Sequence, residues 1–267
     1  MPKHISSIQN QLVKDIIQLQ DKAKTRAKMG LFCVEGVREI TLAQQGGFRL
    51  KTLLFCIEII DFEMLQTIFD ISLIDTLISV SKEVYQKIAY RESTEGVIAV
   101  VETKTFEIEA LKLSKNPLIL VAESPEKPGN IGALLRTADA AQVDAIIITN
   151  PKTDLFNPNV IRASLGCIFT TQIATSSTEK CIEFLKHTNI NIYGATLQDS
   201  AIYYHENYTQ PTALVVGTEA TGLTETFRNA TTKNINIPME GAIDSMNVSV
   251  AAAILIFEAK RQRALHF

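Results

Sequence analysis

Apolar residues follow two different patterns along the first hundred residues. From residue 9 to residue 28 they fall near helical spacing, at Leu12, Ile16 and Leu19, which predicts one helix over this stretch. Shorter apolar runs predict strands at residues 53–57, 71–80 and 96–101, and the stretches between them predict helices at 37–45 and 82–89, the latter with Ser81 as its N-cap. These elements together predict a small α/β domain.

In the second half of the chain, strand-like and helix-like stretches alternate more regularly. Apolar runs predict strands at residues 118–122, 145–149, 190–195, 213–217 and 235–237. Helices are predicted near residues 131–141, 178–188, 223–229 and 246–264. Continuous apolar strands with helices between them are typical of a parallel sheet covered on both faces. We therefore expect a small N-terminal α/β domain at residues 1–103, a linker at 104–116 and a parallel-sheet α/β domain at 117–267.

Composition places the chain among ordinary globular proteins. Of its 267 residues 46% are hydrophobic and 21% charged, which excludes intrinsic disorder and a collagen-like chain. The longest apolar run, near residues 250–257, is far shorter than the ~20 residues that cross a bilayer, and the first residues lack the apolar core of a secretion signal. We therefore expect a cytoplasmic protein. The cysteines and histidines are scattered, so we expect neither a metal site nor a disulfide framework.

Charge is distributed unevenly, although the net charge is only −3. Residues 1–51 contain nine basic and four acidic residues, whereas residues 52–80 contain five acidic residues and no lysine or arginine. A basic patch attracts the phosphates of nucleic acid whatever the net charge of the protein is. The run from Lys22 to Lys28 is equally typical of a solvated helix face, so charge alone leaves both interpretations open.

Three loops with unusual sequences follow predicted strands of the second half, at residues 123–132, 217–223 and 237–247. Ligands of parallel α/β sheets bind at the carboxyl ends of the strands, so these loops are the candidate site. Two nucleotide motifs are excluded there. The dinucleotide fingerprint G-x-G-x-x-G is absent, and Gly217 and Gly222 have the spacing of a P-loop but Leu223 stands where its phosphate-binding lysine would be.

Taken singly, the polar residues of these loops have structural explanations. Asn130, Ser245 and Asn247 stand where helix N-caps would be. A solvated side chain on a helix is the ordinary explanation for Arg136, and a surface acid is the ordinary explanation for Glu219. Their order along the chain carries more information than any one of them.

The run N-I-G-A-L-L-R at residues 130–136, then V-G-T-E-A-T-G-L at 216–223 and I-P-M-x-G-x-x-x-S-M-N at 237–247 resemble three signature motifs of one enzyme family. The family is the SpoU (TrmH-like) RNA ribose 2′-O-methyltransferases of the SPOUT class. Residues 24–38, K-T-R-A-K-M-G-L-F-C-V-E-G-V-R, resemble a segment of that family's L30e-like substrate-binding domain. Two departures are Met246, where the family usually has leucine, and the loop before Asn130, which is often shorter.

The resemblance implies a fold, a cofactor and an assembly. It implies a deep trefoil knot in the C-terminal domain, S-adenosylmethionine (AdoMet) as cofactor, and a homodimer formed through that domain. The residues implied in cofactor binding, largely through the main chain, are Thr196, Gly217, Ile237 and Met246. The residues implied in catalysis are Asn130, Arg136, Glu219, Ser245 and Asn247.

The implied reaction transfers the sulfonium methyl group to a ribose 2′-hydroxyl of structured RNA, with 23S ribosomal RNA as the expected substrate. An ordinary guanidinium stays protonated, so we expect Arg136 to clamp a phosphate and stabilise charge on the attacking oxygen rather than act as a base. RNA contacts are expected from Lys22, Lys24, Arg26, Lys28 and Arg38. The alternatives are a transfer RNA ribose 2′-O-methyltransferase, and a non-catalytic RNA-binding protein of ribosome assembly.

Overall fold

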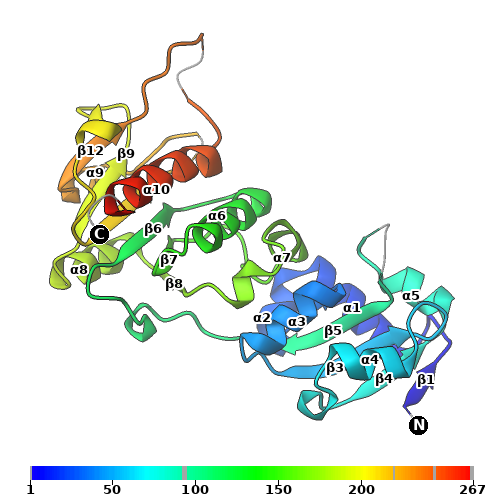
Figure 1. Ribbon diagram of the computed structural model, residues 1–267. Helices are drawn as coiled ribbons and strands as arrows, with labels where there is room; N and C mark the ends of the chain where they lie inside the picture. The colour runs from blue at the N-terminus through cyan, green and yellow to red at the C-terminus, as the bar shows by residue number, and fades with distance from the viewer. Residues whose placement is uncertain (1, 92–94, 219, 243–244, 265–267) are drawn as a thin grey trace. The chain divides into compact units, whose positions relative to one another are not determined.

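The structure is a computed structural model that describes residues 2–91, 95–218, 220–242 and 245–264 (Figure 1). The chain divides into two compact units. The N-terminal unit consists of Met1–Thr105 and Asp154–Thr170, and the C-terminal unit consists of Phe106–Thr153 and Thr171–Phe267. Residues 154–170, which the sequence places in the C-terminal domain, thus pack with the N-terminal unit. Among the described residues, no helix is long and apolar enough to cross a membrane.

A five-stranded sheet with the order β1-β4-β3-β5-β2 forms the centre of the N-terminal unit. β1 and β3 run parallel to β4, whereas β5 runs antiparallel to β2 and β3. Its strands are β1 (Lys3–Ile5), β2 (Leu31–Glu35), β3 (Leu50–Cys56), β4 (Leu77–Val80) and β5 (Val97–Glu102). Its helices are α1 (Gln11–Asp21), α2 (Ala23–Met29), α3 (Val37–Gln45), α4 (Phe62–Ile68), α5 (Lys82–Ile88) and α7 (Pro158–Ala163).

The two faces of this sheet bury different partners. Helices α1 and α5 contribute to one core, which includes Cys33 of β2. Consecutive strand residues point to opposite faces, so Phe32 faces the other side. There the Phe32 ring stacks on Phe156 with the ring centroids 4.3 Å apart, and Phe48 and Phe169 complete the cluster. Segment 154–170 is therefore part of the core of this unit.

The prediction of a single helix over residues 9–28 is wrong, because Lys22 interrupts the helix and separates α1 from α2. The backbone of Lys22 is extended, with φ −119° and ψ 111°. The Arg26 guanidinium donates hydrogen bonds to the carbonyls of Leu19 and Gln20 at the end of α1, at 2.6 and 3.0 Å. These bonds satisfy carbonyl groups that the end of a helix leaves without partners.

The C-terminal unit contains a seven-stranded sheet with the order β10-β12-β9-β11-β6-β7-β8. Each pair of neighbouring strands in it is parallel. The strands are β6 (Leu118–Glu123), β7 (Ala145–Thr149), β8 (Ile173–Ser176), β9 (Asn191–Ala195), β10 (Ala201–Ile202), β11 (Thr212–Val216) and β12 (Lys233–Asn236). The helices are α6 (Pro128–Ala140), α8 (Thr178–His187), α9 (Glu225–Ala230) and α10 (Val248–Ala264).

Helices cover both faces of this parallel sheet, as the sequence predicts. Residues of α8 and α9 share one core with the strands. Helices α6 and α10 lie side by side in contact with each other, α10 also contacts β11, and α6 contacts β7 (Figure 1). The alternative explanation of Asn130 as a helix N-cap is wrong. Helix α6 begins two residues earlier, at Pro128, because proline is well suited to a first helical turn that needs no N–H donor.

Candidate functional site

A cavity of about 340 Å³ lies at the carboxyl edge of the C-terminal sheet. It is lined by residues that follow β9, β11 and β12 and by the start of α10. The four residues predicted to bind a cofactor, Thr196, Gly217, Ile237 and Met246, all line this one cavity. Its volume is within the range of ordinary small-molecule sites. Three segments that are far apart in the sequence therefore form one pocket.

The described residues of the 217–222 loop form one wall of the cavity, and Thr218 and Gly222 pair with each other there. The amide of Thr218 donates to the Gly222 carbonyl at 3.0 Å, and the amide of Gly222 donates to the Thr218 carbonyl at 3.1 Å. A Cβ on Gly217 would lie 2.1 Å from the carbonyl carbon of Gly222. The glycine at position 217 is therefore required by the close approach of two backbone segments.

Asn130 and Asn247 come from two different motifs and meet at the ends of two helices. The side-chain amide of Asn247 donates to the Asn130 side-chain oxygen at 3.1 Å. The Asn247 side-chain oxygen accepts from the backbone amide of Ser249 at 2.9 Å, which caps α10. Asn247 is thus both a helix cap and the link between the first turn of α6 and the start of α10.

Of the three remaining residues predicted to be catalytic, only one is described as lining the cavity. Ser245 lines the cavity and is exposed. Arg136 is exposed on α6 and is not among the cavity-lining residues of the described chain. Glu219 lies outside the described residues. Gln198, Thr218 and Thr221 also line the cavity. None of these three residues was predicted from the sequence, although both threonines stand between the two glycines of the second motif.

Family models match nearly the whole chain. Residues 117–257 match the model of the SpoU rRNA Methylase family, and residues 10–99 match the model of an MRM3-like substrate binding domain. The chain belongs to the SpoU rRNA methylase family. The family predicted from the three motifs is thereby confirmed.

Relatives of this SpoU protein match along its whole length. The 23S rRNA (guanosine(2553)-2′-O)-methyltransferase RlmP of Bacillus subtilis is 29% identical, and the match covers 97% of this chain and 99% of the relative. A crystal structure of an RNA 2′-O ribose methyltransferase is 36% identical, with a TM-score of 0.84 and coverage of 98% and 99%. The AdoMet-bound rRNA methyltransferase from Sinorhizobium meliloti is 27% identical, with a TM-score of 0.89 and 97% of both chains covered. These neighbours confirm the predicted α/β fold class.

The cavity of the SpoU domain has the lining that AdoMet requires. Ile237, Met246 and Val248 provide apolar surface for a flat base, and hydroxyl and amide side chains such as Thr196 and Gln198 stand nearby. None of the described lining residues carries a charge. A lining without charged side chains does not suit a triphosphate but suits a ligand without phosphate groups. The residues present therefore fit the predicted cofactor.

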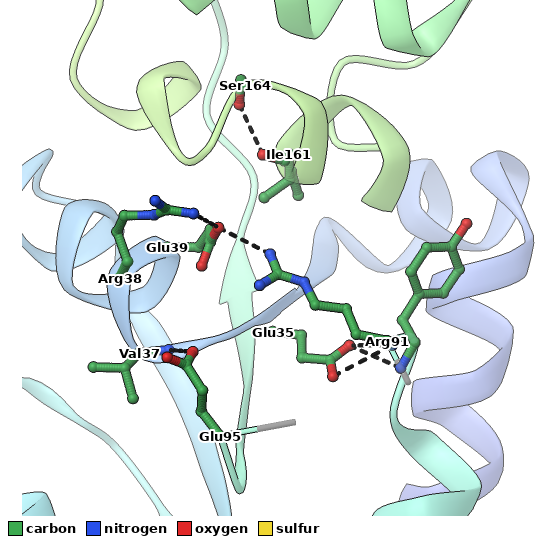
Figure 2. A network of polar contacts seen from close by, with 9 residues as sticks. Glu35, Val37, Arg38, Glu39, Arg91, Glu95, Ile161 and Ser164 are labelled. Atoms are coloured by element: carbon green, nitrogen blue, oxygen red, sulfur yellow. Dashed lines mark hydrogen bonds and ion pairs between the residues drawn. The ribbon is translucent and has the colours of Figure 1, made fainter. Parts of the chain in front are cut away.

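The N-terminal unit of the SpoU protein holds a polar network around the E-G-x-R segment (Figure 2). The Glu35 carboxylate accepts from the backbone amides of Tyr90 and Arg91, at 2.7 and 3.2 Å. The Glu95 carboxylate accepts from the amide of Val37 at 2.8 Å. Together these bonds attach both described ends of the 90–95 loop to the chain around Gly36, whose φ of +105° favours glycine.

Two arginines of this network share one buried carboxylate. Arg91 and Arg38 bind the same oxygen of Glu39, at 2.9 and 3.1 Å (Figure 2). Burial is the largest single influence on the Glu39 carboxyl and opposes its ionisation. The hydrogen bonds from Arg91, Arg38 and the backbone, together with the charge of Arg91, outweigh it, so the pKa of Glu39 lies below its usual value. Burial dominates at Glu35, where it raises the pKa of the carboxyl despite the two amide donors. The Arg38 side chain stays 55% exposed, which leaves it accessible for RNA.

The predicted RNA contact at Arg26 is wrong. Lys22, Lys24 and Lys28 are exposed as predicted, but Arg26 is only 2% exposed. Its guanidinium forms an ion pair with Asp154, in addition to the bonds to the end of α1 described above. We therefore assign Arg26 a structural role in holding segment 154–170 in the N-terminal unit.

We expect the variant Arg26→Ala to lower the free energy of unfolding by about 2 kcal/mol, since the carbonyls at the end of α1 and the Oδ2 atom of Asp154 lose the donor that Arg26 provides. Chemical denaturation monitored by circular dichroism measures this change. The matched control is Lys24→Ala, because Lys24 is an exposed neighbour on the same helix and should leave stability unchanged. A variant of unaltered stability that binds RNA more weakly would restore the original prediction for Arg26.

Proposed function

We propose that this protein transfers a methyl group from AdoMet to a ribose 2′-hydroxyl of 23S ribosomal RNA, and that it does so in the cytoplasm. The observation that carries the proposal is the convergence of residues from separate motifs on one cavity, whose described lining residues carry no charge. The relative from Bacillus subtilis, a 23S rRNA 2′-O-methyltransferase, matches this chain over both units. Residues 1–103 would form the RNA-binding domain and 117–267 the methyltransferase domain, with 104–116 between them.

In this proposal the bound cofactor supplies an activated methyl group, and the side chains of the chain position the acceptor. Asn130 and Asn247, joined at 3.1 Å, orient the ribose, and Ser245 at the cavity orients the cofactor end nearest to it. Arg136 binds the phosphate next to the target ribose through two N–H groups and stabilises charge on the attacking oxygen. Its proton stays in place, so the phosphate or water takes the hydroxyl proton. Glu219 orients a neighbouring side chain.

The exposed surface of α10 supports the proposed homodimer. Val250 and Phe257 are 50% and 52% exposed, and the half-buried Ile254 lies between them at helical spacing. These three side chains form an apolar stripe on α10, the helix that contacts α6, and α6 carries Arg136. A second copy of the chain packed on this stripe would cover it and bring a partner surface to the exposed Arg136. The deep trefoil knot of the family stays a prediction.

Transfer of labelled methyl groups to unmodified ribosomal RNA and to unmodified transfer RNA tests the function. Labelling of a ribose in 23S rRNA is the expected result, and labelling of transfer RNA alone would favour a transfer RNA ribose 2′-O-methyltransferase. A calorimetric titration with AdoMet separates both enzymes from a non-catalytic RNA-binding protein. A protein that binds RNA without binding AdoMet would be a non-catalytic RNA-binding protein.

We expect the triple variant Lys22→Gln, Lys24→Gln and Lys28→Gln to bind ribosomal RNA more weakly. All three lysines are exposed on or next to α2, and each phosphate contact adds about one unit to the slope of log affinity against log salt concentration. Filter binding at several salt concentrations should give a slope smaller by about two to three units. The control variant carries Lys82→Gln and Lys87→Gln on α5, and equal losses in both variants would refute the assignment.

A further inference from the structure

A buried carboxylate lies at the end of β6, next to the cavity loop. Glu123 is the last residue of that strand and is 1% exposed. Its Oε2 atom accepts from the backbone amide of Thr224 at 2.9 Å. Its Oε1 atom accepts from the hydroxyls of Thr224 and Thr178, each at 2.8 Å. Three donors compensate the loss of water around this charge, which would otherwise be costly to bury.

The two threonines belong to different helices. Thr178 is the first residue of α8, whose ten residues place a positive dipole end near the carboxylate. Thr224 is the N-cap of α9 and directly follows Leu223, which is buried in the core. The hydroxyl of Thr178 also accepts from the side-chain amide of Asn150 at 3.0 Å. Glu123 therefore connects the ends of β6 and β7 with the start of α8 and with the end of the 217–222 loop.

Both ends of that loop are attached to neighbouring residues of β6. At its beginning, Val216 pairs with Ala122 in the parallel ladder. At its end, the amide of Thr224 is bound to Glu123, the next residue of the same strand. Between these two attachments lie Gly217, Thr218, Thr221 and Gly222, which line the cavity. The distance between the ends of the loop is thus set by one strand.

We propose that Glu123 is a positioning residue for the methyl-donor cavity, which it shapes by holding the end of the 217–222 loop through Thr224. The inference rests on the proposed function, because it assigns AdoMet to that cavity. Glu123 is not a cavity-lining residue among those described, so it acts on the cofactor only through the loop. The same carboxylate also accepts from Thr178, which belongs to α8 and not to the loop.

The variant Glu123→Gln tests this assignment on the full-length protein, because glutamine keeps the shape but removes the charge. The backbone amide of Thr224 can only donate, so the glutamine oxygen must turn to it. The glutamine NH₂ group then competes with Asn150 and Phe227 for the two hydroxyls. We expect the Kd of AdoMet, measured by calorimetry well below the melting temperature, to rise about tenfold. The KM for AdoMet should rise more than kcat falls.

The matched control is Thr178→Val, which removes one hydrogen bond from the same carboxylate and leaves both Thr224 contacts. It should lower the melting temperature but leave the Kd of AdoMet within about twofold of the wild-type value. Equal Kd values for Glu123→Gln and the wild type, or equal increases in Glu123→Gln and Thr178→Val, would overturn the inference. A wild-type protein that does not bind AdoMet would overturn the proposed function, and the inference with it.

A second pair of variants keeps the test decisive if Glu123→Gln does not fold. Thr224→Ala removes the hydroxyl contact and keeps the backbone contact, so the Kd of AdoMet should rise by a smaller factor than for Glu123→Gln. Thr224→Ser restores the hydroxyl and should restore the wild-type Kd. An unchanged Kd in Thr224→Ala, or a Kd that stays raised in Thr224→Ser, would also overturn the inference, because the cavity would then not respond to the loss and return of a Glu123 contact.

Discussion

Replacing Arg136 with alanine should lower the rate of methyl transfer to RNA about 1,000-fold and leave the Kd of AdoMet within about twofold. The two effects separate because Arg136 is exposed on α6 and is not among the described residues that line the cavity. In our proposal its guanidinium binds a phosphate and stabilises charge that develops on the attacking oxygen, so its loss affects the chemical step. Single-turnover methylation of unmodified 23S rRNA measures the rate, and calorimetry measures the Kd.

Arg136→Lys tests which property of the guanidinium matters. Lysine keeps the charge but cannot bind a phosphate through two parallel N–H groups, so its rate should stay well below that of the wild type. Lys186→Ala is the control, because Lys186 is an exposed cation on α8 of the same unit. Near wild-type turnover in Arg136→Lys, with unchanged affinity for RNA, would refute the bidentate phosphate contact.

The strands of the C-terminal sheet were largely predictable because a parallel sheet needs continuous apolar runs. The five predicted strands correspond to β6, β7, β9, β11 and β12. β8 escaped prediction because only half of its four residues are buried, and α7 because six residues are too few for a helical pattern. The sequence offered no local sign that residues 154–170 pack with the N-terminal unit. Their phenylalanines contact Phe32 and Phe48, which lie more than 100 positions earlier.

The cavity was predictable from local motifs, whereas the contacts that support it were not. Gly217 and Met246 could be selected because their motifs have a distinctive order and spacing. The burial of Arg26 depends on Asp154, and the role of Glu123 depends on Thr178 and Thr224. Threonine and aspartate are common residues, and nothing in the sequence marks which distant ones will meet. A pairing between side chains so far apart emerges only from the folded chain.

Replacing Gly217 with alanine should weaken AdoMet binding about 100-fold while leaving the fold intact. The new Cβ would lie 2.1 Å from the carbonyl carbon and 2.3 Å from the carbonyl oxygen of Gly222. Both are backbone atoms, so the methyl group cannot be accommodated by rotating a side chain. The loop would have to open at the two hydrogen bonds between Thr218 and Gly222, and this would displace one wall of the cavity.

Gly222→Ala provides the comparison, because it changes the same loop without this collision. Gly222 has a φ of +67°, but a Cβ there would meet no atom within 4 Å. The expected cost is the backbone strain alone, about 1 kcal/mol, which corresponds to a roughly fivefold increase in the Kd of AdoMet. Calorimetry and thermal melts of both variants check the order of effects. A greater loss of affinity in Gly222→Ala than in Gly217→Ala would mean that the closed form of the loop is not the one that binds the cofactor.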